Sequence, residues 1–149
     1  MEQKLPEEKI ERVIKTTNPF KDERGIIDNY DLEFPVNMAN TITSKAGSVR
    51  ANHYHPEQLQ QVLLVSGKYI SVYKDLTNPK SQIKHHLIQA GDLVVTPPIV
   101  AHTMIFLEDS IIINLVPGNR DHDKFGVHTI KYELVPESEK ERYIQMYKE

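Results

Sequence analysis

Hydrophobic and polar residues alternate in short runs through the middle of this chain. Successive side chains of a strand point to opposite faces, so this alternation predicts β-strands. The runs are separated by turn residues, as at Ser66-Gly67 and Pro97-Pro98. Ten strands are expected: Gly25–Tyr30, Val36–Ser44, Arg50–Tyr54, Leu59–Val65, Lys68–Lys74, Ile83–Gln89, Asp92–Val95, His102–Phe106, Ile111–Leu115 and Thr129–Leu134. Strands at this spacing indicate an all-β barrel or sandwich.

The two ends of the chain show a helical period instead. Pro6 to Lys15 and Pro136 to Lys148 each begin with proline, carry acidic residues early and place hydrophobic residues on one face. We therefore expect a short helix at each end. The length fits a single domain over residues 1–149, with a barrel core at about residues 22–134.

Histidines occupy positions where the strand pattern predicts buried residues. His53 and His55 are two residues apart, so on a strand they share a face with their backbones about 7 Å apart. Two imidazoles so placed suit one metal ion at about 2.0–2.1 Å from each, or one substrate. A third histidine, His102, opens another expected strand.

Two spaced motifs surround these histidines. The first runs Gly47, five residues, His53-Tyr54-His55, four residues, Gln60, six residues, Gly67. The second runs Gly91, five residues, Pro97-Pro98-Ile99, two residues, His102, three residues, Phe106. Both resemble the motifs of the cupin superfamily, G-x5-H-x-H-x(3,4)-E-x6-G and G-x5-P-x-G-x2-H-x3-N. The spacings agree, and three residue types depart from the pattern: Gln60, Ile99 and Phe106.

The resemblance implies an antiparallel cupin barrel (a double-stranded β-helix or jelly roll) with the three histidines inside. It also implies a metal site formed by His53, His55, Gln60 and His102. Three imidazoles and one oxygen suit a divalent transition metal such as Zn, Ni, Mn or Fe. Gln60 is neutral where the family has a carboxylate, so binding should be weaker, or Gln60 orients His55 instead. Glu57 is read as a solvated turn residue.

A second resemblance is to nucleotide-deoxysugar epimerases and ketoisomerases, which are RmlC-like cupins. Asp22-Glu23-Arg24-Gly25 is similar to their D-E-R-G segment, and Arg50-Ala-Asn-His53-Tyr-His55 to their R-x-x-H-x-H segment. The resemblance implies that His53 or His55 is a catalytic base and that Arg24 and Arg50 bind the substrate diphosphate, often without metal. Imidazole exchanges protons near neutral pH, and arginine matches phosphate in a two-pronged way.

Three details of this interpretation stay open in the sequence. A tyrosine or a second histidine would return the proton, and Tyr30, Tyr69 and Tyr132 are the tyrosine candidates. Strand alternation sends Arg50 to the face opposite His53 unless a bulge intervenes. The polar cluster Asp121-His122-Asp123 is read as a solvated turn.

Composition narrows the range of partners. The net charge of -3 gives no electrostatic case for nucleic acid or an acidic membrane. The chain has no cysteine, which excludes disulfides and thiolate metal sites. No apolar run reaches a membrane span of about 20 residues, and residues 1–9 lack a signal core, so we expect a cytoplasmic protein. A homodimer is expected, because dimers are the commonest soluble oligomers.

The leading functional hypothesis is a nucleotide-sugar isomerase or epimerase in cell-surface polysaccharide biosynthesis. The segment Ala51-Asn-His53-Tyr-His55 is also similar to the cupin half of capsular-polysaccharide reductases, which belongs to the same theme. One alternative is a non-catalytic metal- or sugar-binding cupin module. The other is a metal-dependent dioxygenase-type cupin, which would need open coordination positions on its metal.

Overall fold

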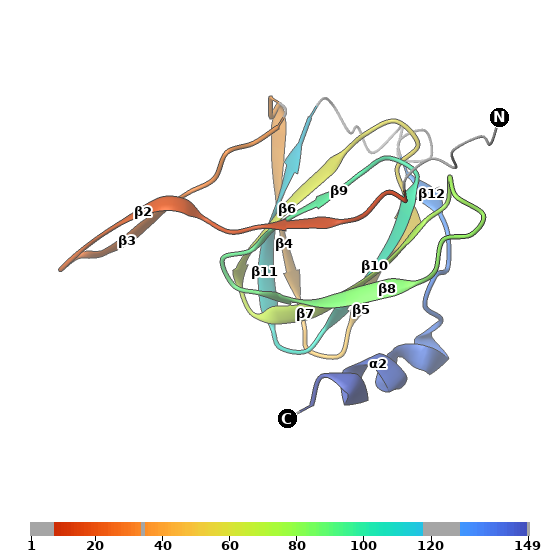
Figure 1. Ribbon diagram of the computed structural model, residues 1–149. Coiled ribbons are helices and arrows are strands. Elements are labelled where there is room, and N and C mark those ends of the chain that lie inside the picture. Colours follow the sequence, from red (N-terminus) through yellow and green to blue (C-terminus); the bar gives the residue numbers. More distant parts are fainter. Residues whose placement is uncertain (1–7, 34, 118–128, 149) are drawn as a thin grey trace.

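Two five-stranded sheets face each other and form a barrel (Figure 1). The computed structural model describes residues 8–33, 35–117 and 129–148. The first sheet contains, in spatial order, β1 (Arg12–Ile14), β9 (Leu93–Thr96), β6 (Gln60–Ser66), β11 (Ser110–Val116) and β4 (Met38–Ser44). The second contains β12 (Ile130–Lys131), β5 (Val49–Tyr54), β10 (Val100–Phe106), β7 (Lys68–Asp75) and β8 (Lys84–Gln89). Every pairing is antiparallel, so the expected all-β architecture is confirmed.

The central strands of the second sheet, β7 and β10, are buried on both faces. Tyr69, Met104 and Phe106 belong to the core cluster that also takes in side chains of the opposite sheet, inside the barrel. Alternate residues such as Ile70 and Ile105 belong to a second cluster with the C-terminal segment. Strands covered on both sides need apolar residues at nearly every position, which explains the continuous apolar runs.

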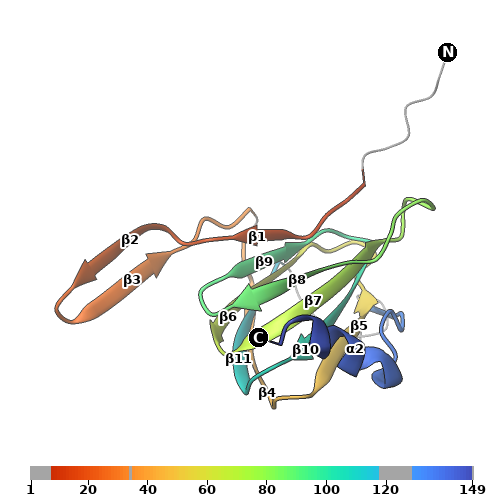
Figure 2. The same ribbon diagram turned by 60° about the horizontal axis from the view of Figure 1, so that its bottom comes forward.

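The C-terminal helix is confirmed, although it is shorter than expected. A 3-10 turn, η2 (Glu137–Glu139), leads into α2 (Lys140–Met146). Tyr143 of α2 is buried in the outer cluster, and Figure 2 shows the helix lying over the second sheet. This segment therefore closes the outer face of the sheet that carries the histidines.

The N-terminal helix expected between Pro6 and Lys15 is wrong for the described residues. Residues 12–14 form β1 and pair with β9 at the edge of the first sheet. Just before it, the Glu11 side chain is buried, accepts a hydrogen bond of 2.8 Å from the Thr96 hydroxyl and lies 2.8 Å from His86 Nε2. These tertiary contacts outweigh a helical pattern that was weak in so short a segment.

A two-stranded hairpin, β2 (Thr17–Asp22) and β3 (Gly25–Asn29), projects from the barrel (Figures 1 and 2). The sequence predicted β3 and missed β2, because Asn18-Pro19 has the composition of a turn. Asn18 has a φ of 48°, and the register of the hairpin is irregular there.

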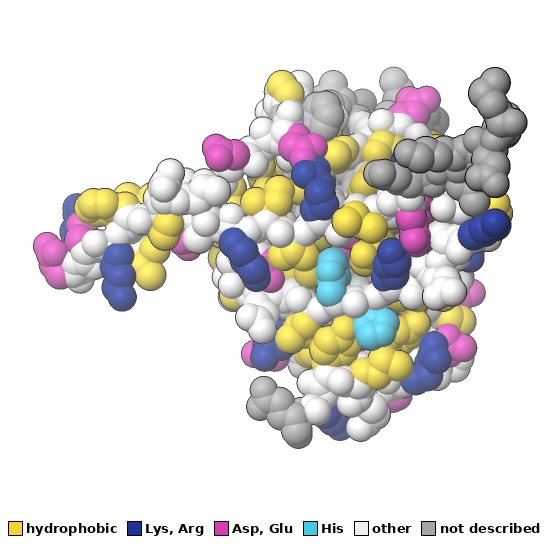
Figure 3. Space-filling model, viewed as in Figure 1, with side chains coloured by type: hydrophobic (Ala, Val, Ile, Leu, Met, Phe, Trp, Pro, Cys, Tyr) yellow, Lys and Arg dark blue, Asp and Glu magenta, His cyan; other side chains and the backbone are white. Residues whose placement is uncertain are grey.

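The hairpin exposes large hydrophobic side chains. Phe20, Ile26 and Ile27 are 53%, 59% and 58% exposed. Figure 3 shows hydrophobic side chains along the projecting arm, interspersed with charged ones. In the described part of the chain, no helix is long and apolar enough to cross a membrane.

Candidate functional site

A β-bulge in β5 brings an arginine to the same side as the histidines. Against β10, the register of β5 slips between His53 and Ala51, so Asn52 is the extra residue. Ala51 and Asn52 have φ values of 71° and 53°, in the left-handed region. Plain alternation would point Arg50 away from His53, and the bulge reverses that parity. Both residues consequently line one cavity.

The side chain of Asn52 holds this bulge in place. Its Oδ1 accepts hydrogen bonds from the Thr103 hydroxyl at 2.5 Å and from the Val135 N–H at 3.0 Å. Its Nδ2 donates to the Val135 carbonyl at 3.0 Å, and the Tyr132 N–H donates to the Asn52 carbonyl at 2.8 Å. The C-terminal segment is thereby attached to the strand that carries the site.

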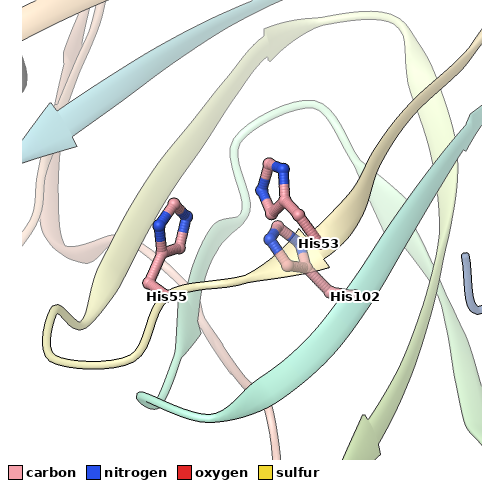
Figure 4. A group of neighbouring side chains, drawn as sticks. All are labelled: His53, His55 and His102. Carbon is pink, nitrogen blue, oxygen red and sulfur yellow. The ribbon is translucent and has the colours of Figure 1, made fainter. Parts of the chain in front are cut away.

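Three histidines converge inside the barrel (Figure 4). His53 lies in β5, and His55 directly follows the end of that strand. His102 lies in β10 and pairs in register with His53. The ring centroid of His53 lies 4.8 Å from that of His55 and 4.8 Å from that of His102. His55 and His102 are each 3% exposed. The expectation that two distant segments bring these side chains together is confirmed.

A cavity of about 420 Å³ lies in front of His53 and His55, between the two sheets. Its lining combines polar side chains from both sheets with apolar ones: Asn40, Ile42, Val49, Arg50, Ala51, His53, His55, Gln60, Val62, Met104, Ile112, Asn114 and Thr129. Thr129 Oγ1 lies 3.3 Å from His55 Nδ1. No carboxylate is among these lining residues, so the described wall of the cavity is neutral or cationic.

The other predicted site residues fall into two groups. Gln60 lines the cavity from β6, on the sheet opposite the histidines, and is 7% exposed. Glu57 is exposed and lines a different, shallow hollow, which agrees with its reading as a turn residue. Arg24 lies in the hairpin turn, where its Nη2 is 2.6 Å from Asp22 Oδ2. Its side-chain and backbone hydrogen bonds lower the pKa of Asp22.

None of the tyrosines lines the cavity. All seven tyrosines of the chain are among the described residues. The Tyr30 hydroxyl donates to the Gly91 carbonyl at 2.6 Å. Tyr69 is buried in the core, and that burial raises its pKa well above the usual value. Tyr132 packs against the outer cluster. Among the described residues, the cavity therefore offers a second histidine, and no tyrosine, for returning the proton.

Sequence reasoning missed two asparagines, Asn40 and Asn114. They lie directly opposite each other on β4 and β11, and both line the cavity. A signal was present, because Asn114 interrupts the run Ile111-Ile-Ile-Asn-Leu-Val at a position that alternation turns inward. The cluster Asp121-His122-Asp123 lies outside the described residues.

Comparisons with known proteins give structural matches alone: no protein-family model matches the chain, and no curated protein matches it. A dTDP-4-dehydrorhamnose 3,5-epimerase from Bacillus anthracis, with TDP and PPi bound, has a TM-score of 0.66 and 20% identity over 80% of this chain and 76% of that chain. The epimerase of the same name from Sulfolobus tokodaii has a TM-score of 0.66 and 24% identity, covering 83% and 79% of the two chains.

A third structure covers more of both chains. It is a mutant of the 3,4-ketoisomerase QdtA from Thermoanaerobacterium thermosaccharolyticum in complex with TDP-4-keto-6-deoxyglucose, with a TM-score of 0.68 and 16% identity over 93% of this chain and 97% of that chain. The fold of this chain is an RmlC-like cupin barrel. The cupin architecture predicted from the two histidine motifs is thus confirmed.

Proposed function

We propose that this cupin is a nucleotide-sugar isomerase or epimerase. The observation that carries the proposal is the cavity in which His53, His55 and Arg50 share one wall because of the bulge at Asn52. Structures with the same fold belong to a 3,5-epimerase with TDP and PPi bound and to a ketoisomerase in complex with TDP-4-keto-6-deoxyglucose. A role in cell-surface polysaccharide biosynthesis and a cytoplasmic location stay predictions.

His53 is the proposed base. It lies between His55 and His102 and lines the cavity. A neutral imidazole nitrogen removes the proton from the carbon next to the sugar ketone, and the C–H electron pair passes into an enolate. His55, from the same wall, then returns a proton to carbon. Return of the proton to the former ketone carbon, with the proton of the adjacent hydroxyl passing to the former ketone oxygen, gives isomerisation. Return to the opposite face of the original carbon gives epimerisation.

Arg50 is the proposed diphosphate ligand. Its Nε donates to Ser44 Oγ at 2.7 Å, and its Nη2 donates to the Thr43 carbonyl at 3.0 Å. These bonds fix the guanidinium plane, and the fork retains further N–H groups for phosphate oxygens. Arg50 also lines a second, open hollow of about 720 Å³ with Lys45 and Ser48. A diphosphate at Arg50 would leave the sugar beside the histidines and the nucleoside in this second hollow.

Arg24 can contribute only from another copy of the chain, because its hairpin projects away from the barrel that carries the histidines. We propose a homodimer in which the hairpin packs against the partner. A two-stranded hairpin is at best marginally stable alone in water, and this one exposes Phe20, Ile26 and Ile27. A second copy would cover these side chains and bring Arg24 towards a partner's surface.

Sedimentation equilibrium tests the dimer. The wild-type chain should be dimeric at micromolar concentration, and Ile27→Ser should weaken the dimer because it removes apolar contacts twice in a symmetric pair. Ile83→Ser, on the barrel and 45% exposed, is the matched control and should leave the dimer intact. A wild-type monomer would contradict this proposal.

Deuterium exchange tests the enzymatic function. In D₂O, the purified protein should exchange the proton next to the ketone of TDP-4-keto-6-deoxyglucose. His53→Ala should lower the exchange rate by about 10²–10⁴-fold, the usual contribution of a general base. His85→Ala, an exposed histidine bonded to the Tyr147 hydroxyl on the outer side, should not change it. Absence of exchange with every 4-keto sugar nucleotide would overturn the proposal in favour of a non-catalytic sugar-binding module.

A metal site is a second proposal, supported by the histidine cluster itself. One ligand nitrogen from each of His53, His55 and His102 lies within 4.8 Å of the others. Two ligands at about 2.1 Å from one ion are at most about 4.2 Å apart, so small side-chain rotations would suffice. Gln60 would supply a neutral oxygen, and the donor set suits Zn, Ni, Mn or Fe. Such an ion would polarise the substrate ketone as a Lewis acid.

A further inference from the structure

The cavity has a second polar wall, on the sheet opposite the histidines. Gln60 of β6 and Asn114 of β11 both line the cavity. Asn114 pairs in register with Val62, which lies two residues after Gln60 and also lines the cavity. The two amides therefore lie on the same face of adjacent strands. The other cavity-lining residues of these two strands, Val62 and Ile112, are apolar.

Both amides are buried with an oxygen that lacks a hydrogen-bond partner. Gln60 is 7% exposed and Asn114 is 6% exposed. Gln60 Oε1 and Asn114 Oδ1 have no hydrogen-bond partner among the residues that the structure describes. Burying a polar oxygen without a partner is unfavourable, so such groups in a native protein call for an explanation, and at a cavity wall a bound ligand supplies one. Here both belong to side chains that line a cavity able to hold a ligand.

The chemistry of this wall defines what it can bind. An amide oxygen accepts a hydrogen bond without adding charge, and the amide N–H₂ can donate one. A hydroxyl group both donates and accepts, so it matches an amide. An ammonium or guanidinium group would gain little from a cavity whose described lining contains arginine and histidine but no carboxylate to pair with it. The ligand group that faces this wall is therefore neutral and rich in hydroxyls.

We propose that Gln60 and Asn114 form a recognition site for hydroxyl groups of the sugar ring, opposite the histidines that would act on its keto end. This inference rests on the proposed function for the identity of the ligand. It adds to that function by naming the residues that bind the hydroxyl groups of the sugar. It also separates two roles of Gln60. A metal ion on the histidines would recruit Gln60 but not Asn114, whereas sugar recognition uses both amides.

Calorimetric titration with two probes tests the inference. TDP carries the nucleotide and diphosphate, and dTDP-quinovose adds a hydroxylated sugar without a ketone, so it binds without turnover. Gln60→Leu and Asn114→Leu should each weaken dTDP-quinovose binding by about tenfold, the value of one hydrogen bond, and leave TDP binding within twofold of wild type. Gln61→Leu is the matched control: it is a fully buried glutamine on the same strand that does not line the cavity.

The outcomes distinguish this inference from the proposed function. Loss of the sugar-dependent affinity in both amide variants, with Gln61→Leu unchanged, supports the inference whether or not the wild type exchanges protons. Unchanged dTDP-quinovose binding in both variants overturns it, even if proton exchange occurs. An effect of Gln60→Leu alone also overturns it and favours the metal role. If the wild type binds dTDP-quinovose no better than TDP, the inference is wrong. Circular dichroism and melting curves confirm that each variant is folded.

Discussion

The two walls of the cavity differ in the kind of chemistry that they offer. The wall from β5 and β10, here called the reactive wall, carries side chains that can take up a proton or are permanently charged. They are His53, His55 and Arg50, with His102 beside them. The wall from β6 and β11, here called the amide wall, carries the neutral amides of Gln60 and Asn114 between the apolar side chains of Val62 and Ile112. One wall can move protons and bind phosphate, while the other can bind hydroxyl groups without competing for a proton. A reaction that shifts one proton on a ring with several hydroxyls needs both.

The backbones of the two walls differ as well. The pairing of β11 with β4 is regular over its seven residues, so Asn40 and Asn114 meet by plain alternation. Against β6, the register of β11 shifts only between Ile111 and Ile112, away from Asn114. β5 departs from regular geometry at Ala51 and Asn52, where left-handed backbone values accompany the bulge. Irregular backbone near a functional site is a common way to redirect a side chain. In this barrel it redirects Arg50.

The largest expected effect separates the two histidines of the reactive wall. If His53 removes the proton and His55 returns it, His53→Ala should lower both solvent exchange and product formation by about 10²–10⁴-fold. His55→Ala should lower product formation by a similar factor while the substrate still loses its proton to D₂O. Mass spectrometry of recovered substrate and product measures both rates.

The reverse pattern would exchange the two roles. If His55→Ala abolishes substrate labelling and His53→Ala retains it, His55 is the base. Gln60→Leu is the comparison from the amide wall, and it should reduce both rates together by about tenfold, because it weakens binding rather than proton transfer.

The second prediction concerns the bulge. Asn52→Leu removes three side-chain hydrogen bonds, to Thr103 and twice to Val135, each worth about 1 kcal/mol. The free energy of unfolding should fall by about 3 kcal/mol in urea titrations. Thr103→Val removes only one of these three bonds and should lose about 1 kcal/mol. Equal losses for the two variants would show that the side chain does not hold the bulge.

Sequence alone predicted the reactive wall better than the amide wall. The motif spacings located all three histidines of the reactive wall but only Gln60 of the amide wall, because spacing along strands fixes which face a residue takes. The left-handed backbone of the bulge leaves no comparable signal, since neither Ala51 nor Asn52 is a glycine. Asn114 had no motif around it, and only its inward position in an apolar run set it apart.

The fold was predictable where periodicity was long and failed where tertiary contacts decided. The strands of the barrel and the C-terminal helix were located within a few residues. The segment at residues 12–14 became a strand because β9 offers a pairing edge and Glu11 finds buried partners. No local pattern contains that information, because the pairing edge lies about 80 residues away in the chain.

The third prediction tests whether the reactive wall also binds metal. At a hundredfold excess over the dissociation constant, an ion that binds only the native state stabilises it by about 2.7 kcal/mol. Zn²⁺, Ni²⁺ or Mn²⁺ should therefore raise the melting temperature, and His102→Ala should abolish the rise. Gln60→Glu should increase it, because a carboxylate offsets part of the ionic charge. If no ion changes the melting temperature, the metal proposal is wrong and the histidines act in proton transfer alone.

The smallest expected effect comes from the amide wall in the absence of ligand. Leucine has the same branched arrangement of side-chain heavy atoms as asparagine, and Asn114→Leu removes a buried oxygen that lacks a partner in the described structure. The unliganded variant should therefore be more stable than wild type by about 1 kcal/mol in urea titrations, because the desolvation cost disappears. His55→Ala should be destabilising instead, since it opens a cavity beside Thr129. If Asn114→Leu destabilises the protein, the Asn114 amide stabilises the barrel, and the contrast between the reactive wall and the amide wall fails.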